Sequence, residues 1–515
     1  MPTAAAPARS NLSSKPYTAL GAKLREVATL GSIQRTMAYD QETIMPEAGA
    51  AFRADQLSLL AGMCHRKSTD PAIGDLISAC EADAAVMADT TAAANVREAR
   101  RDFDRLTKLP NDLVEEISKA SSLGMEAWKL ARSKSDFASF QPHLEHIVSL
   151  VRRKAECYGI PPWGAELYDA LMDEYEPGMT AKRTAEIFTP LREFTVGLVD
   201  KVRSSGKEVD ESVIYTECPI DSQKAFSQRV VEKLGFDMHA GRIDQSTHPF
   251  CEGLAPGDTR FTNRFSADGW ADQLFTAAHE NGHGIYEQGL PKAAEFGWPS
   301  AEAVSLGIHE SQSRMLENLV CRSRAFWDWG LPTAREFMPM IPASLTPDAI
   351  FRAINAVKPW FIRVESDEVT YNLHIMLRFD IERALISGDL KVKDLPGEWN
   401  RRMKADLGLD IKEDRLGCLQ DIHWSMASIG YFATYTLGNL YAAQLWEAMA
   451  TDVKDREAKI ARGEFTEIIA WLRDRIHRHG RTYSPAQLCE RATGKPLDSG
   501  ALKRHLEAKV KSIYG

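Results

Sequence analysis

Apolar residues recur at spacings of three and four along most of the chain, which is the pattern of helices with one buried face. In the first half, the pattern predicts helices over 18–38, 50–66, 72–90, 92–107, 110–133, 136–157 and 180–206. In the second half, it predicts helices over 268–289, 300–325, 346–355, 368–386, 396–406, 424–449, 463–479 and 499–513. Pro, Gly, Asp or Thr stand at the boundaries, as helix caps and stops do. The sequence therefore predicts a mainly α fold.

Strand patterns are rare in this chain. The two predicted strands are Val213-Ile214-Tyr215 and the alternating run 259–265, which follows Pro256-Gly257. The second run ends just before the helix predicted over 268–289. We therefore expect a small β-sheet beside that helix.

Turn residues separate the predicted helices without marking a boundary between domains. Asp221 and Ser222 can cap one further helix, which Gly235 then ends. The chain has no internal repeat, no low-complexity tract and no long linker. We expect one body over residues 1–515, with residues 1–15, rich in Ala, Ser and Pro, as a flexible tail.

Charge and cysteine usage narrow the class of protein. A net charge of −9 argues against nucleic acid or an anionic membrane as a partner. No apolar run reaches the roughly 18 residues that a membrane-spanning helix needs. The eight cysteines are scattered without a C-x-x-C pair, which is typical of a reduced, cytoplasmic protein.

Residues 279–283 read His-Glu-Asn-Gly-His, the H-E-x-x-H pattern. On a helix, His279 and His283 project from one face and can bind a single divalent metal ion through neutral imidazole nitrogens. Glu280 between them can reach a metal-bound water as a general base. Gly282 is a poor helix former, so its presence suggests that another part of the chain approaches the backbone closely.

Two histidines need at least one more protein ligand. The downstream carboxylates are Glu287, Glu295, Glu302, Glu310 and Glu317. A return helix that packs against the first one would bring Glu310 to the metal from a different side, as a tetrahedral site requires. Spacing alone does not decide whether Glu302, Glu310 or Glu317 is the third ligand.

Five motifs follow one another in order along the chain. They are D-x-R-x-T at 258–262, H-E-x-x-H at 279–283, H-E-S-Q at 309–312, I-R-x-x-S-D at 362–367 and G-x-x-Q-D-x-H-W at 417–424. Together they resemble the motifs of the thermostable carboxypeptidase (Taq) family of metallocarboxypeptidases. Ser366 replaces the Ala of the family pattern I-R-x-x-A-D, and this departure leaves Arg363 and Asp367 intact.

The resemblance implies a fold, a metal site and a reaction. The family fold is a saddle-shaped helical body with a deep central groove, formed by one continuous domain. His279, His283 and Glu310 are implied as ligands of one divalent metal ion, for which zinc is the first candidate and cobalt or manganese are alternatives. The implied reaction releases single amino acids from peptides with a free C-terminus, with Glu280 as general base. The family also implies a homodimer.

Further site residues follow from the chemistry of peptide hydrolysis. His423 and Tyr431 are candidate donors to the oxyanion of the tetrahedral intermediate, and Tyr435 is the alternative to Tyr431. An enzyme that removes C-terminal residues must bind a free carboxylate, which the planar fork of an arginine does best. Arg260 and Arg363 stand in two of the motifs and are the candidates for this role.

Each of the two arginines has a competing structural explanation, since Asp258 or Asp367 could be its ion-pair partner. Two other functions also compete with a carboxypeptidase. One is an oligopeptidase that cuts inside peptides, and the Arg260 and Arg363 motifs argue against it. The other is a peptide-binding scaffold without catalysis, and the intact Glu280 argues against it.

Overall fold

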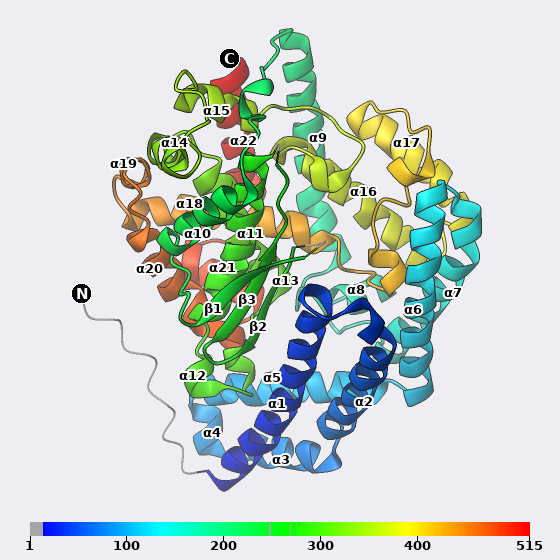
Figure 1. The fold of residues 1–515 in the computed structure, drawn as a ribbon. Coiled ribbons are helices and arrows are strands. Elements are labelled where there is room, and N and C mark those ends of the chain that lie inside the picture. The colour runs from blue at the N-terminus through cyan, green and yellow to red at the C-terminus, as the bar shows by residue number, and fades with distance from the viewer. Residues whose placement is uncertain (1–13, 247–248, 268) are drawn as a thin grey trace.

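Helices form most of the structure (Figure 1). The computed structural model describes residues 14–246, 249–267 and 269–515. The helices before the sheet are α1 (Lys15–Thr43), α2 (Ala50–Ser68), α3 (Pro71–Glu81), α4 (Ala84–Ala88), α5 (Thr90–Lys108), α6 (Asn111–Lys134), α7 (Phe137–Tyr158), α8 (Leu167–Met172), α9 (Ala181–Ser205) and α10 (Ile220–Lys233). After the sheet come α11 (Trp270–Gly289), α12 (Lys292–Glu295), α13 (Leu306–Arg314), α14 (Phe326–Phe337), α15 (Pro347–Ile354), α16 (Glu368–Ser387), α17 (Leu395–Leu407), α18 (Ala433–Asp452), α19 (Arg456–Ile460), α20 (Thr466–Arg475), α21 (Pro485–Thr493) and α22 (Gly500–Tyr514). The predicted mainly helical fold is confirmed.

Capping residues divide or shift some of the predicted helices. The segment 72–90 contains two helices, α3 and α4, because the side chain of Asp83 accepts the backbone hydrogen bonds that begin α4. Asp221 and Ser222 do not cap α10, since this helix already begins one residue earlier and both lie in its first turn. Gly235 follows the end of α10 with a φ of +94°, as predicted. The helical pattern misses α8, α12, α14, α19 and α21.

Two further predicted helices are interrupted close to the candidate site. In 300–325, α13 covers only the middle and continues into a π-helix, Met315–Cys321. In 424–449, the first residues are not α-helical. His423–Met426 form a 3₁₀ turn, Ala427 takes a left-handed φ of +59°, and α18 begins only afterwards. These interruptions redirect the side chains that follow them.

A three-stranded sheet precedes α11, as the sequence predicts. Its strands are β1 (Gly241–Gln245), β2 (Cys251–Ala255) and β3 (Asp258–Asn263), in the order β1-β3-β2. β1 runs parallel to β3 and β2 runs antiparallel to it. α11 contacts β2 and β3, and α1 contacts β2 (Figure 1). The predicted strand at 213–215 is wrong, because Ser212–Ile214 form a 3₁₀ turn.

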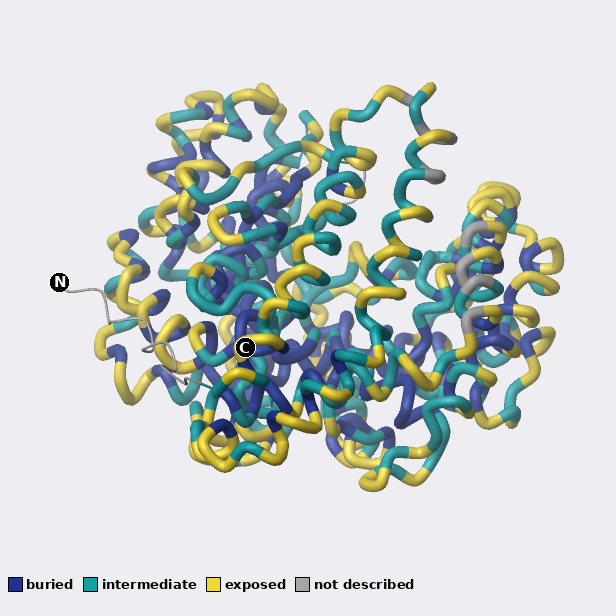
Figure 2. The backbone as a smooth tube through the Cα atoms, turned by 90° about the horizontal axis from the view of Figure 1, so that it is seen from below, coloured by how far each residue is buried: buried dark blue, intermediate teal, exposed yellow. Residues whose placement is uncertain are grey.

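Buried side chains form two apolar clusters. The larger cluster extends from α6 to α22 and surrounds α11, α13, α16 and α18. Figure 2 shows the buried residues gathered in the interior of the body, with exposed residues at its outer turns. The smaller cluster lies between α1, α3 and α5 and consists of Tyr17, Leu20, Ile73, Ile77, Cys80, Val86, Ala92, Val96 and Ala99. None of the described helices is both long and apolar enough to cross a membrane.

Most of the predicted flexible tail, residues 1–13, lies outside the described part of the chain. The last two residues of that predicted tail belong to α1. The Ser14 hydroxyl accepts a hydrogen bond from the backbone N–H of Tyr17 at 3.4 Å, which caps the helix, and Lys15 is its first residue.

α13 packs directly against the backbone of α11 at Gly282. A Cβ atom added to Gly282 would lie 2.3 Å from the Cα of Ser313 and 2.4 Å from the carbonyl oxygen of Gln312. The prediction of a close approach at Gly282 is therefore confirmed. α18 approaches the other side of α13 in a similar way, since a Cβ on Gly438 would lie 2.5 Å from Cγ of Glu310.

Replacing Gly282 with Ala is expected to lower the free energy of unfolding by about 1–3 kcal/mol, because a methyl group would push the two helices apart. Thermal unfolding measures the change. Gly197→Ala is the matched control, since Gly197 is exposed within α9 and an added Cβ meets nothing within 4 Å. That change should leave stability unchanged or raise it by ~0.5–1 kcal/mol. Equal stability of the two variants would contradict the close approach.

Candidate metal centre

Two imidazoles from α11 and one carboxylate from α13 converge on one point. His279, His283 and Glu310 each offer one donor atom, and these atoms all lie within 4.8 Å of one another. Oε2 of Glu310 lies 3.6 Å from Nε2 of His279 and 3.4 Å from Nε2 of His283. Two histidine nitrogens and a carboxylate oxygen are a donor set that binds zinc and related divalent ions. The described residues therefore fit a metal ion.

The other oxygen of Glu310 is already occupied. Nε of Arg314 donates to Oε1 of Glu310 at 2.6 Å, while Ser313 donates to Oε2 at 3.0 Å. Burial opposes ionisation of Glu310, but Arg314 and the two imidazoles hold its pKa well below the usual range. Burial also lowers the pKa of His283 to about 4, which keeps this imidazole neutral. The charged carboxylate and the neutral imidazole are the forms that bind a metal ion.

Glu280 lies between the two histidines on α11 and is buried. Burial raises the pKa of its carboxyl to about 7, although the charge of His279 acts in the opposite direction. A carboxylate with a pKa near neutrality can both accept and return a proton at physiological pH. The position and the pKa of Glu280 therefore suit acid–base chemistry beside the donor cluster.

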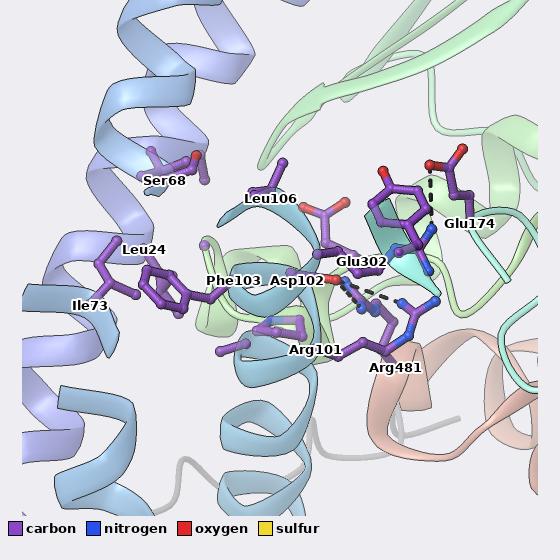
Figure 3. A pocket seen from close by; sticks show the side chains of 17 residues that line it. Leu24, Ser68, Ile73, Arg101, Asp102, Phe103, Leu106, Glu174, Glu302 and Arg481 are labelled. Atoms are coloured by element: carbon purple, nitrogen blue, oxygen red, sulfur yellow. Dashed lines mark hydrogen bonds and ion pairs between the residues drawn. The ribbon is translucent and has the colours of Figure 1, made fainter. Parts of the chain in front are cut away.

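Glu317 and Glu302, the other two candidates for the third ligand, lie outside the donor cluster. Glu317, on the π-helix, contacts the far side of the His279 ring, with Oε2 at 3.0 Å from Nδ1. It is also paired with Arg314 and Arg322. Glu302 lines a separate cavity of about 430 Å³ with residues of α1, α5 and the segment after α12 and with Arg481, and no residue of the donor cluster lines it. Figure 3 shows Glu302 and Arg481 among the side chains of this cavity. Of the three, only Glu310 belongs to the donor cluster.

His423, Tyr431 and Tyr435 lie together where α18 begins. Nε2 of His423 is 3.2 Å from the hydroxyl of Tyr435, and the ring centroids of His423 and Tyr431 are 5.3 Å apart. Burial lowers the pKa of His423 to about 3, so the ring is neutral. Burial, with the charge of Glu310, raises the pKa of Tyr431 to about 12, so its hydroxyl keeps its proton. The hydroxyl can therefore donate a hydrogen bond.

A buried carboxylate holds the loop that carries His423 and Tyr431. Glu382 accepts hydrogen bonds from Nε1 of Trp424 at 2.9 Å and from the backbone N–H of Gly430 at 3.1 Å. The hydroxyl of Tyr168 donates to the same carboxylate at 2.7 Å. Glu382 thus joins the two ends of the loop to α16.

Arg363 is buried in an ion pair with Asp421. Its Nε and Nη2 donate to Oδ1 of Asp421 at 3.0 and 2.8 Å, and its Nη1 donates to the hydroxyl of Tyr371 at 2.9 Å. Arg378 pairs with the other oxygen of Asp421. Asp367 is not the partner of Arg363, because its side chain caps α16. The structural partner of Arg363 is therefore Asp421.

Arg260 lies on the face of the sheet that is turned towards α1. Both of its forked nitrogens donate to Asp258 at 2.7 Å, and its guanidinium lies over the ring of Tyr39 at 5.4 Å. The structure therefore places Arg260 in the ion pair that its motif contains. Neither Asp258 nor Tyr39 belongs to the donor cluster.

Sequence reasoning assigns no role to several residues that hold the site. Arg314 follows Glu310 by four positions on α13, a helical spacing that could have indicated the pair. Asp421 stands inside the last motif, but its partner Arg363 is 58 residues away. Glu382 carries no signal in the sequence, since a glutamate on a helix is usually exposed.

Comparisons with known proteins identify the family of this chain. Residues 19–510 match the family described as Carboxypeptidase Taq (M32) metallopeptidase. The chain is 42% identical to Thermostable carboxypeptidase 1 of Thermus thermophilus, over 95% of this chain and 97% of that protein. It is 35% identical to Carboxypeptidase 1 of Bacillus subtilis, with the same coverage. The crystal structure of the M32 carboxypeptidase from Deinococcus radiodurans R1 has a TM-score of 0.93 and 36% identity, over 98% of this chain and 100% of that one.

A helical body in which two histidines and a glutamate converge is that of a metallopeptidase. The chain belongs to the carboxypeptidase Taq (M32) family of metallopeptidases. The family resemblance, the fold class and the enzyme class predicted from the sequence are thereby confirmed. The protein is a metal-dependent peptide hydrolase of the carboxypeptidase type, and its family implies a divalent metal ion.

Replacing Glu310 with Ala should remove the metal ion, because two histidine ligands alone bind it weakly. We expect one divalent ion per chain in the purified protein and less than one tenth of that in the variant, measured by elemental analysis after dialysis. Glu302→Ala is the matched control and should keep the ion, since Glu302 lies in the separate cavity. Loss of the ion in the control alone would move the third ligand to Glu302.

Proposed function

We propose that the enzyme releases single amino acids from the free C-terminus of peptides, with His279, His283 and Glu310 holding one divalent ion. The observation that carries this proposal is the convergence of two imidazole nitrogens on Oε2 of Glu310, beside the buried Glu280. A divalent ion in such a site activates a water molecule and polarises the scissile carbonyl. The remaining steps fall to the side chains around it.

Glu280 acts as the general base. Its carboxylate accepts the proton of the attacking water and passes it to the leaving amine, a task for which a pKa of about 7 is suited. A glutamate between the two histidines on one helix stays within reach of whatever those histidines bind.

His423 and Tyr431 donate to the oxyanion that forms on the scissile carbonyl. The hydroxyl of Tyr431 keeps its proton at neutral pH, and it lies close enough to Glu310 for the charge of that carboxylate to raise its pKa. Donors of this kind act best when they are held before the substrate arrives. The Glu382 contacts with Trp424 and Gly430 hold this loop. Tyr435 remains the alternative donor, since its hydroxyl contacts His423.

Arg363 binds the terminal carboxylate of the substrate, and Arg260 is the second candidate. The guanidiniums of Arg363 and Arg378 share the single carboxylate of Asp421. These three buried side chains together therefore carry an excess positive charge. Such a charge attracts an anionic chain end. Recognition of the free carboxylate is what separates a carboxypeptidase from an oligopeptidase that cuts inside peptides.

Three finer assignments complete the proposal. Zinc is the metal we propose, with cobalt or manganese as alternatives that the same donor set accepts. The eight cysteines are all free, which supports a reducing compartment such as the cytoplasm. A homodimer is proposed from the family resemblance alone, and sedimentation of the purified protein would test it.

Glu280→Gln should keep the metal ion and lose at least about a thousandfold in kcat, because the amide fits the space but cannot accept a proton. Steady-state kinetics on metal-replete protein, with the metal content measured in the same samples, provide the test. Near-normal turnover in a variant that holds one ion per chain would exclude Glu280 as the general base.

Arg363→Ala should lower kcat/KM for free peptides by on the order of a hundredfold, because the variant loses a charge-assisted, two-pronged contact. The same peptide with an amidated C-terminus should be cleaved poorly by the wild type and hardly worse by the variant. Arg363→Lys should recover part of the loss, since an ammonium supplies charge without the fork.

Arg363 is already buried against Asp421, so a purely structural role is the alternative to substrate binding. If Arg363→Ala loses activity equally on the free and the amidated peptide, its role is structural. Arg260→Ala is then assayed on the same pair of substrates. A wild-type enzyme that cleaves the amidated peptide as well as the free one would instead favour the oligopeptidase.

A further inference from the structure

A chain of polar contacts runs from His283 away from the donor cluster. Nδ1 of His283, on the opposite side of the ring from Glu310, lies 2.5 Å from Nδ1 of His309. Nε2 of His309 lies 2.8 Å from Oε1 of Glu287. The other oxygen of Glu287 is paired with the ammonium group of Lys292. These groups are largely shielded from solvent, so the contacts are not in competition with bulk water.

The hydrogen positions along these contacts follow from what each group can donate or accept. Burial opposes ionisation of Glu287, but Lys292 and His309 hold its pKa below the usual range, so the carboxylate can only accept. Nε2 of His309 therefore donates to this carboxylate, and an imidazole that carries its hydrogen on Nε2 offers Nδ1 as an acceptor. Two ring nitrogens 2.5 Å apart must have one proton between them. Because Nε2 of His283 faces Oε2 of Glu310 and belongs to the proposed ligand set, the arrangement in which Nδ1 of His283 donates to Nδ1 of His309 is the one that matches metal binding.

With its hydrogen on Nδ1, His283 presents the lone pair of Nε2 towards Glu310. In the other tautomer, Nε2 would carry the hydrogen and could not bind a metal ion. We infer that His309 and Glu287 are positioning residues, which hold His283 in its metal-binding tautomer and orientation. The inference rests on the proposed ligand set and adds two residues to which that proposal gives no role.

His279 has the same arrangement with one group fewer, since no second imidazole stands between its ring and a carboxylate. Its Nδ1 contacts the carboxylate of Glu317 directly at 3.0 Å. Metal-binding histidines commonly donate their second N–H to a carboxylate in this way. For His283, the imidazole of His309 stands between the ring and its carboxylate. His309 directly precedes Glu310 on α13, so one helix supplies both a donor to the metal and a support for a second donor.

Measurements of metal affinity can distinguish a positioning role of His309 and Glu287 from a role in packing alone. Dissociation constants for zinc, measured by competition with a chelator at one pH, are compared for the wild type and four variants. His309→Ala and Glu287→Gln should each weaken binding by roughly ten- to a hundredfold. His309→Gln should bind within a few-fold of the wild type, because an amide oxygen can accept from His283 while the amide nitrogen donates to Glu287. Glu398→Gln is the control and should not differ, since this carboxylate pairs with Arg401 and Arg402 on α17, a helix that packs on α9 and α16.

Unfolding curves of the metal-free proteins show whether each variant is folded. If both His309→Gln and His309→Ala are folded, the difference between their zinc affinities decides the question. Equal weakening by these two changes would overturn the inference, as would wild-type affinity in His309→Ala. Glu310→Ala identifies a failure of the ligand set itself. If that variant keeps the ion, the proposed function fails with it. If only the His309 and Glu287 variants behave as the wild type, the ligand set stands and the positioning role does not.

Discussion

The site depends on the direct contact between the backbones of α11 and α13 at Gly282. No side chain separates the helices there, since even a Cβ would lie 2.3 Å from the Cα of Ser313. Because side chains at neighbouring positions of α13 point in different directions, this one contact brings Glu310 to the donor cluster and His309 to the back of His283. The π-helix that continues α13 then places Glu317 behind His279. Both imidazoles are thus held between two residues of the same helical segment.

Burying so many charges is tolerable because most of them have a charged partner. An isolated charge taken from water would cost several kcal/mol, and a pair that loses one partner is strongly destabilised. Glu310 is paired with Arg314, Glu287 with Lys292, and Asp421 with both Arg363 and Arg378. Glu280 is the exception within the site. Its raised pKa follows from burial without a comparable cation, and this same feature equips it for proton transfer.

The parts of the site that lie on regular helices could be predicted from spacing. His279 and His283 share a face of α11 because they are four residues apart, and Gly282 correctly indicates a close neighbour. Spacing could not choose among the downstream carboxylates, because the choice depends on how α13 packs. It also could not foresee the turn before α18. Apolar residues there fit a helical period, whereas the left-handed Ala427 and the Glu382 contacts impose a loop.

The donor cluster and the ion pairs of Asp421 are connected through one aromatic ring, that of Tyr371. Arg314 donates to Glu310 and stacks on Tyr371 at 4.4 Å, while the hydroxyl of Tyr371 accepts a hydrogen bond from Arg363. Glu310, which we propose as a metal ligand, and Arg363, which we propose for the substrate carboxylate, are therefore linked by two side chains, Arg314 and Tyr371. A buried polar network of this kind is stable only when its members are satisfied, because displacing one member leaves another without a partner. Tyr371 is thus a shared neighbour of both arginines, since its hydroxyl accepts from Arg363 and its ring lies under Arg314.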